Sequence, residues 1–221
     1  MRNKYLIYII SFLFLITSCS KKDIQLPLLA SDGLSDIYNH SSIWLFFEKN
    51  GKDTLAVLNK NNKIINTHWL LNIDKRLIMK YVVPVLCEIQ KAKYKPSMHG
   101  KEGTFIYFAY ANTKSNNISL IEFKPTNFIS SEKQVKDTVN EDQIIKINLQ
   151  KDKILINNIL TDLDHVKNIL RDYKSKDSLN NSRIFLKYNE GISYQKYLQT
   201  KMILSKINMA IDSTENIYSI K

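Results

Sequence analysis

Residues 144–170, IIKINLQKDKILINNILTDLDHVKNIL, decide how the second half of this chain folds. Apolar residues alternate with polar ones in IIKINL (residues 144–149), which is typical of a strand with one buried face. The polar turn QKDK leads to a second apolar run, ILINN (residues 154–158). Thr161 is a suitable N-cap, and apolar residues then recur at helical spacing as far as Tyr173. The stretch therefore predicts strand, strand and helix in that order.

The residues that follow complete a small domain. RIFLKY (residues 183–188) reads as a strand, and Ser193 can cap a helix that runs to about Ile207. Residues 217–220 are expected to form a short last strand. The predicted order over residues 143–221 is ββαβαβ, which belongs to the α+β fold class.

A first α+β domain is expected over residues 42–129, so the chain is predicted to hold two small α+β domains. Residues 130–142 (SSEKQVKDTVNED) carry no apolar period and are interpreted as a linker. The expected elements of the first domain are strands at 43–47, 54–58 and 64–73, a helix at 75–93 that contains Pro84, and strands at 105–111 and 118–123. Its aromatic residues fit a core better than a binding surface: Trp44, Trp69, Tyr107, Phe108 and Tyr110.

The N-terminal residues predict that the protein is located in the cell envelope. Arg2 and Lys4 precede an apolar run that is shorter than the ~20 residues needed to span a bilayer, as in a signal peptide. The sequence Ile-Thr-Ser before Cys19 resembles the lipobox of bacterial lipoproteins, which implies removal of residues 1–18 and lipidation of Cys19. Residues 19–41 would then form a tether. The alternatives are an ordinary secretory peptide and an uncleaved short anchor.

Net charge and cysteine content indicate which classes of binding partner are expected. The chain has 32 Lys and Arg against 21 Asp and Glu, a formal charge of +11, and loss of Arg2 and Lys4 lowers it to +9. The basic residues are scattered, and an exported protein is not expected to bind nucleic acid. A solvated surface, or attraction to anionic lipid or cell-wall polymer, is expected instead. If Cys19 carries lipid, Cys87 has no partner within the chain, and we expect a buried thiol in a helix.

The C-terminal pattern resembles a known family. IIKINLQKDKILINNILTDLDHVKNIL and RIFLKYNEGISYQKYLQTKMIL (residues 183–204) are similar to the periplasmic domain of the ExbD/TolR family, over residues 142–220. The resemblance implies a non-enzymatic domain that binds partners or cell wall and forms homodimers. Family members carry protons on an Asp within a transmembrane helix, but residues 5–18 contain no acidic residue. The family has Ala-Asp where this chain has Tyr188-Asn189-Glu190.

Candidate binding residues follow from the strand at 183–188. We expect it to be an edge strand that pairs with a partner's strand or with a second copy of the chain. The candidate site comprises Arg183, Lys187, Tyr188, Asn189 and Glu190. The two domains could also be duplicates, because residues 59–86 roughly parallel residues 149–170.

No motif in the sequence predicts catalysis. No histidine pair has the spacing of a helical zinc site, and neither CxxC nor GxSxG occurs. We therefore expect no metal, no cofactor and no enzyme activity. A lipid-anchored hydrolase that uses His68 or Cys87 is the weakest alternative.

The predicted function is a lipid-anchored periplasmic accessory protein of a TonB/Tol-like system, with ExbB-, ExbD- or TonB-like partners. The alternative is a structural lipoprotein that contacts the cell wall. Ser20 follows Cys19 in place of an Asp that would resemble an inner-membrane retention signal, so the outer membrane is favoured over the inner membrane.

Overall fold

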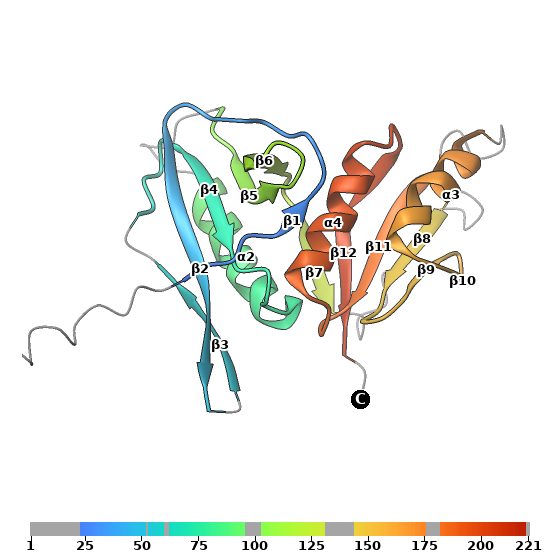
Figure 1. Ribbon diagram of the computed structural model, residues 1–221, viewed down its shortest axis with the longest axis horizontal. Coiled ribbons are helices and arrows are strands. Elements are labelled where there is room, and N and C mark those ends of the chain that lie inside the picture. The colour runs from blue at the N-terminus through green and yellow to red at the C-terminus, as the bar shows by residue number, and fades with distance from the viewer. Residues whose placement is uncertain are drawn as a thin grey trace, which may run out of the picture.

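Two mixed β-sheets and three helices make up the part of the chain that the computed structural model describes, which is residues 23–51, 53–59, 62–95, 103–130, 144–175 and 182–219 (Figure 1). The first sheet has the order β1-β5-β4-β2-β3, and β6 also pairs with β5. Its elements are β1 (Leu28–Leu29), β2 (His40–Asn50), β3 (Asp53–Leu58), β4 (His68–Ile73), α2 (Met79–Tyr94), β5 (Ile106–Asn112) and β6 (Asn117–Phe123). Gly51 lies at φ 62° in the turn between β2 and β3, a conformation that favours glycine.

The second sheet has the order β10-β9-β8-β11-β12-β7. Its elements are β7 (Asn127–Ser130), β8 (Ile144–Leu149), β9 (Ile154–Ile156), β10 (Ile159–Thr161), α3 (Leu163–Ser175), β11 (Arg183–Asn189), α4 (Tyr194–Ser205) and β12 (Ala210–Tyr218). The predicted order of strand, strand, helix, strand, helix, strand is confirmed from β8 to β12, with the short β10 as an addition. The mixed α/β architecture agrees with the predicted α+β class.

The helix caps explain where the helices of the second sheet begin. The Ser193 hydroxyl accepts a hydrogen bond from the Lys196 N–H at 3.2 Å, as predicted for the start of α4. At the start of α3 the carboxylate of Asp162, and not the expected Thr161, accepts the N–H of His165 at 3.0 Å. Thr161 instead ends β10, which moves the start of the helix by one residue.

The two sheets share one hydrophobic core. The buried cluster includes Trp69 and Leu86 from the first half together with Leu186 and Leu198 from the second. We call the described part of residues 23–126 the first unit and that of residues 127–219 the second unit. They lie side by side, with β1 next to α4 (Figure 1). Because the core is continuous, the units are expected to unfold together.

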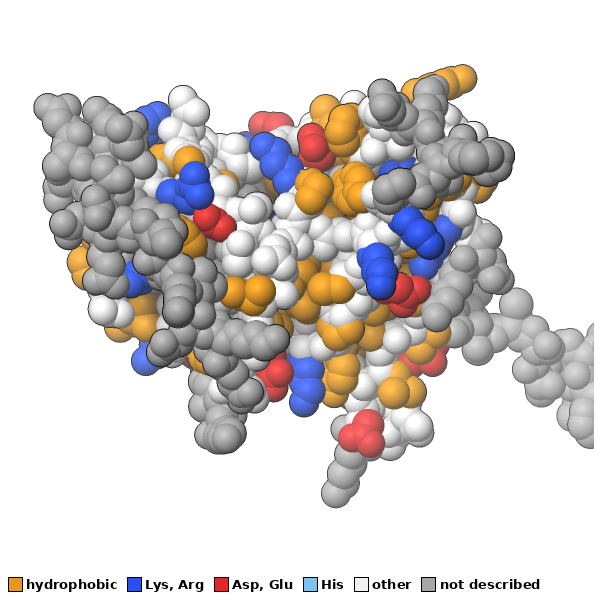
Figure 2. Space-filling model, turned by 180° about the vertical axis from the view of Figure 1, so that it is seen from behind, with side chains coloured by type: hydrophobic (Ala, Val, Ile, Leu, Met, Phe, Trp, Pro, Cys, Tyr) orange, Lys and Arg blue, Asp and Glu red, His pale blue; other side chains and the backbone are white. Residues whose placement is uncertain are grey.

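Within the described part of the chain, helices cover one face of the second sheet. Burial alternates along β8 and β11, as a half-buried strand requires. On the other face Lys146 and Lys187 are exposed and Phe185 is half-buried. Seen from behind, the molecule shows hydrophobic side chains in the middle of its surface, with basic and acidic side chains around them (Figure 2).

Most of the expected tether is part of the fold. β1 pairs with β5 in parallel, and the side chain of Leu29 is buried. Leu34 forms a further bridge with Leu120 of β6. The described residues 23–41 are therefore packed against the first unit, while Cys19 lies outside the described residues. Ser130, the first residue of the expected linker, still belongs to β7, and residues 131–142 lie outside the described residues.

Candidate functional site

Residues 23–29, which we call the N-terminal segment, lie at the junction of the two units, and we call the set of contacts that holds them there the groove. The Gln25 N–H donates to Oδ2 of Asp74 at 3.1 Å, and the Gln25 carbonyl accepts the N–H of Lys75 at 2.7 Å. Further along, the N–H groups of Ala111 and Thr113 donate to the Pro27 and Leu29 carbonyls at 2.8 and 3.0 Å. The groove therefore recognises the backbone of an extended segment, as in β-strand addition.

The second unit closes the groove from the other side. Gln195 lies in the first turn of α4, and its amide oxygen accepts the Leu28 N–H at 2.8 Å. The Gln195 amide nitrogen donates to the Leu28 carbonyl at 2.7 Å. One side chain thus satisfies both backbone groups of one residue. Because Asp74 comes from the first unit and Gln195 from the second, the site requires both units.

Asp74 is the charged centre of this groove. Its side chain is fully buried, and Arg76 makes two hydrogen bonds to it, at 2.9 and 2.6 Å. The Arg76 N–H also donates to Oδ1 at 2.9 Å. This pairing raises the pKa of the Arg76 guanidinium. A buried carboxylate with these donors is a fixed acceptor for one more N–H group, which Gln25 supplies.

The five predicted binding residues do not lie on a sheet edge. β11 pairs with β8 on one side and with β12 on the other, so it cannot accept a partner's strand. The expectation of an edge strand was wrong, because strand order is set by contacts that are distant in sequence. Arg183 is exposed and pairs with Asp212 at 3.2 Å, and Lys187 lies 4.8 Å from the ring centre of Tyr218.

The other three predicted residues are buried or lie at the junction. Tyr188 is fully buried, and burial raises the pKa of its hydroxyl. Asn189 donates to the Tyr218 carbonyl at 3.4 Å and accepts the N–H of Gly191 at 2.8 Å. Glu190 lies 3.9 Å from the ammonium of Lys80, a residue of the first unit. Glu190 therefore lies at the junction of the units, whereas the Asn189 side chain bonds within the second unit.

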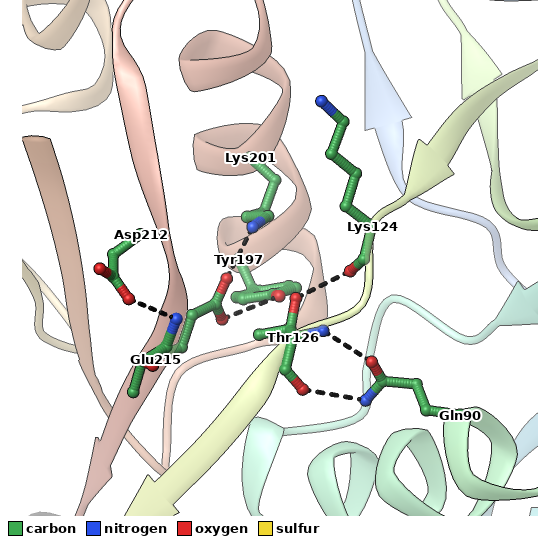
Figure 3. A network of polar contacts seen from close by, with 8 residues as sticks. Gln90, Lys124, Thr126, Tyr197, Lys201, Asp212 and Glu215 are labelled. Atoms are coloured by element: carbon green, nitrogen blue, oxygen red, sulfur yellow. Dashed lines mark hydrogen bonds and ion pairs between the residues drawn. The ribbon is translucent and has the colours of Figure 1, made fainter. Parts of the chain in front are cut away.

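A buried polar network supports α4 and β12 from within (Figure 3). Glu215 is fully buried, and it accepts hydrogen bonds from the Tyr197 hydroxyl at 3.0 Å and from the Lys201 ammonium at 2.6 Å. Gln90 of α2 makes two hydrogen bonds to the backbone of Thr126, just before β7. These contacts hold β7 in position where the chain crosses between the units.

A cavity of about 560 Å³ lies between the units, close to this network. Its apolar lining includes Phe108 and Phe123 of the first unit and Met209 of the second. Lys124 and Lys206 also line it, together with Lys201. Glu122 and Asp212 line it as well, so the charges of its lining are mixed. Its volume is in the range of small-molecule sites, roughly 300–1,000 Å³.

The residues considered for a hydrolase lie on different elements, His68 on β4 and Cys87 on α2. Nδ1 of His68 accepts the N–H of Phe105 at 3.1 Å. Cys87 is exposed, contrary to the expected buried thiol, because it lies on the outward side of α2. Its neighbours partly desolvate it and raise the pKa of the thiol, which lowers the reactive thiolate fraction. Within the described residues, no group of three His, Cys, Asp or Glu could hold a metal ion.

Sequence reasoning missed the residues that form the groove. The missed signal was LNID (residues 71–74), an aspartate directly after a buried strand and before a helix. In the second unit, β11 ends at Asn189 instead of an aspartate. Gln195 gave no signal, because its role depends on the distant Leu28.

Comparison with known proteins identified no relative: no family model, curated protein or solved structure matches the chain. Among the described helices, none has the length and apolar character needed to cross a bilayer.

Proposed function

We propose that this protein is a lipid-anchored binding module of the cell envelope, acting as an accessory or partner of a TonB- or Tol-like energy-coupling complex. The observation that carries the proposal is the groove around Asp74 and Gln195, which holds an extended backbone just after the expected lipid anchor at Cys19. Hydrogen bonds to the backbone of an extended segment are a recurring mode of peptide recognition, which suits a binding module.

The order of β8 to β12 supports the ExbD/TolR part of the proposal, because it is the order expected from the resemblance. Ile73-Asp74 adds to this support. It provides, in the first unit, the strand-end aspartate that Asn189 replaces in the second. Residues 5–18 contain no acidic residue, so we assign no proton-carrying role to this chain.

The position of the groove also affects where a partner binds. Between Cys19 and Asp23 the chain can extend by at most roughly 14 Å, at about 3.6 Å per residue. The folded body would therefore lie close to the membrane that carries the lipid, and not at the end of a long tether. A partner in the opposite membrane would have to reach across the periplasm towards it.

Affinity purification from detergent-solubilised membranes tests the proposal. ExbB-, ExbD- or TonB-like proteins are expected to co-purify with the wild-type protein at near-stoichiometric levels. Two matched controls are purified in the same way. Asp74→Asn alters the groove, and Cys19→Ala removes the cysteine expected to carry the lipid anchor. Stoichiometric recovery of unrelated outer-membrane proteins alone would contradict the proposed partnership.

A second candidate function, contact with the cell wall, is favoured by the three lysines at the cavity between the units. If it is correct, the protein should sediment with purified peptidoglycan at low salt. Lys124→Gln combined with Lys206→Gln should then reduce pelleting, because both cations line the cavity. Failure of the wild-type protein to pellet at low salt would exclude this candidate.

A further inference from the structure

The two units have the same strand order. The central strands of the first sheet run β3-β2-β4-β5, and those of the second run β9-β8-β11-β12. In both, the first two strands form an antiparallel pair and the next two pairings are parallel. In both, a helix connects the last two of these strands, α2 in the first unit and α4 in the second. By this shared order, β4 corresponds to β11 and α2 corresponds to α4.

Individual positions correspond as well. Ile78 is the N-cap of α2 and Ser193 is the N-cap of α4, and both have extended backbone angles. When these two residues are aligned, buried positions of one unit coincide with buried positions of the other. The coinciding pairs are Trp69 with Ile184, Leu71 with Leu186, Ile73 with Tyr188, Asp74 with Asn189, Leu77 with Ile192, Met79 with Tyr194 and Val82 with Tyr197.

The units contact each other through these same corresponding residues. Ile78 and Ser193 form an antiparallel bridge. The Met79 N–H donates to the Ile192 carbonyl at 2.9 Å, and the Tyr194 N–H donates to the Leu77 carbonyl at 2.7 Å. Met79 and Tyr194 are counterparts, and so are Leu77 and Ile192, so the two hydrogen bonds are equivalent. This is the reciprocal pattern of a twofold interface between identical subunits.

We propose that the chain is a fused dimer of one repeated unit, with a local twofold axis at the contact between Ile78 and Ser193. The repeat differs from the expected one, because residues 59–86 do not correspond to residues 149–170. In the first unit, the described residues between β3 and β4 contain no helix, so α3 has no counterpart there. The twofold contact therefore lies within a single chain.

The two copies differ at the groove. In the first unit, Asp74 accepts the N–H of Gln25, and the Lys75 N–H donates to the Gln25 carbonyl. In the second unit the corresponding Asn189 donates to the Tyr218 carbonyl, and the Glu190 N–H donates to the same carbonyl at 2.8 Å. The Tyr218 carbonyl at the end of β12 thus takes the place that the Gln25 carbonyl has in the first unit. Each chain therefore has one such groove, built from both units.

Substitution of counterpart residues in the full-length chain tests this asymmetry. Lys80 is the twofold counterpart of Gln195, so Gln195→Ala and Lys80→Ala form a matched pair. Gln195→Ala removes two hydrogen bonds to Leu28 and should speed exchange of the Leu28 amide roughly tenfold or more. Lys80→Ala should leave that exchange unchanged. Equal acceleration by both variants, or no acceleration by Gln195→Ala, would overturn the proposal of one composite groove.

Disulfide formation tests the local twofold contact. In a Cys87→Ser background of the full-length chain, Ile78→Cys with Ser193→Cys should form a bond within one chain on mild oxidation. The control pairs Ile78→Cys with Gln199→Cys, which lies roughly 9 Å further along α4 at 1.5 Å per residue and beyond the usual reach of a disulfide. The purified protein should have the mass of one chain. Disulfide-linked pairs of chains, or a dimer mass, would overturn the fused-dimer proposal.

Discussion

The ion pair between Lys201 and Glu215 yields the sharpest energetic prediction. The Glu215 side chain is fully buried, and the Lys201 side chain is 20% exposed, with their charged atoms 2.6 Å apart. The other hydrogen bond to this carboxylate comes from the neutral Tyr197 hydroxyl. Lys201→Met keeps most of the apolar stem but leaves a buried carboxylate without its cation.

The expected loss of stability follows from the burial of the two partners. Removal of one partner from a fully buried pair costs about 3–5 kcal/mol. Water can reach part of Lys201, so we expect Lys201→Met to lower the free energy of unfolding by about 2–4 kcal/mol. That is a large fraction of the ~5–15 kcal/mol typical of a folded protein.

A double variant is the control. Lys201→Met with Glu215→Leu removes both charges and should recover most of the loss, because a buried pair is often replaceable by apolar residues. It leaves the Tyr197 hydroxyl without its acceptor, at a cost of about 1–3 kcal/mol. Addition of Tyr197→Phe should remove that cost as well.

Urea unfolding followed by circular dichroism and fluorescence measures these differences, provided that both probes report one transition. The reasoning would be refuted if Lys201→Met cost less than about 0.5 kcal/mol, as for an exposed pair. It would also be refuted if the double variant were as unstable as the single one.

Three further predictions concern buried and exposed side chains. No described residue forms a hydrogen bond with the buried hydroxyls of Tyr188 and Tyr194, so Tyr188→Phe and Tyr194→Phe should be neutral or stabilising by up to about 1 kcal/mol in urea unfolding. Burial raises the pKa of both hydroxyls and of Tyr197. Because these tyrosines ionise near pH ~10 in the unfolded chain, stability should fall as the pH rises above that value, and Tyr188→Phe should reduce the slope. Cys87 should react with a maleimide in the native protein, faster at higher pH; protection until urea unfolds the chain would contradict its exposure.

Local periodicity was sufficient to predict most elements. IIKINL forms β8 over the predicted residues, and RIFLKY forms β11 with one additional residue. These strands are predictable because alternation of apolar and polar residues reflects one buried face. Trp69, Phe108 and Tyr110 are buried, as predicted for core aromatics, whereas Trp44 is half-buried.

Elements that depend on distant partners were missed. β12 begins at Ala210, although we expected a short strand over residues 217–220. Glu215 interrupts the apolar pattern, and its burial is tolerated only because Tyr197 and Lys201 bind its carboxylate. β1 and β7 are too short to give a periodic signal, and each is defined by its pairing with a strand far along the chain.

By itself, the sequence determined where most strands and helices form and the α+β class, since these depend on neighbours within a few residues. The lipidation of Cys19 stays a prediction of the sequence. Only the tertiary structure decided that β11 is central, that Asp74 and Gln195 form one groove, and that Ile78 meets Ser193. Strand order and contacts between units join residues that are far apart in the chain, so no local pattern encodes them.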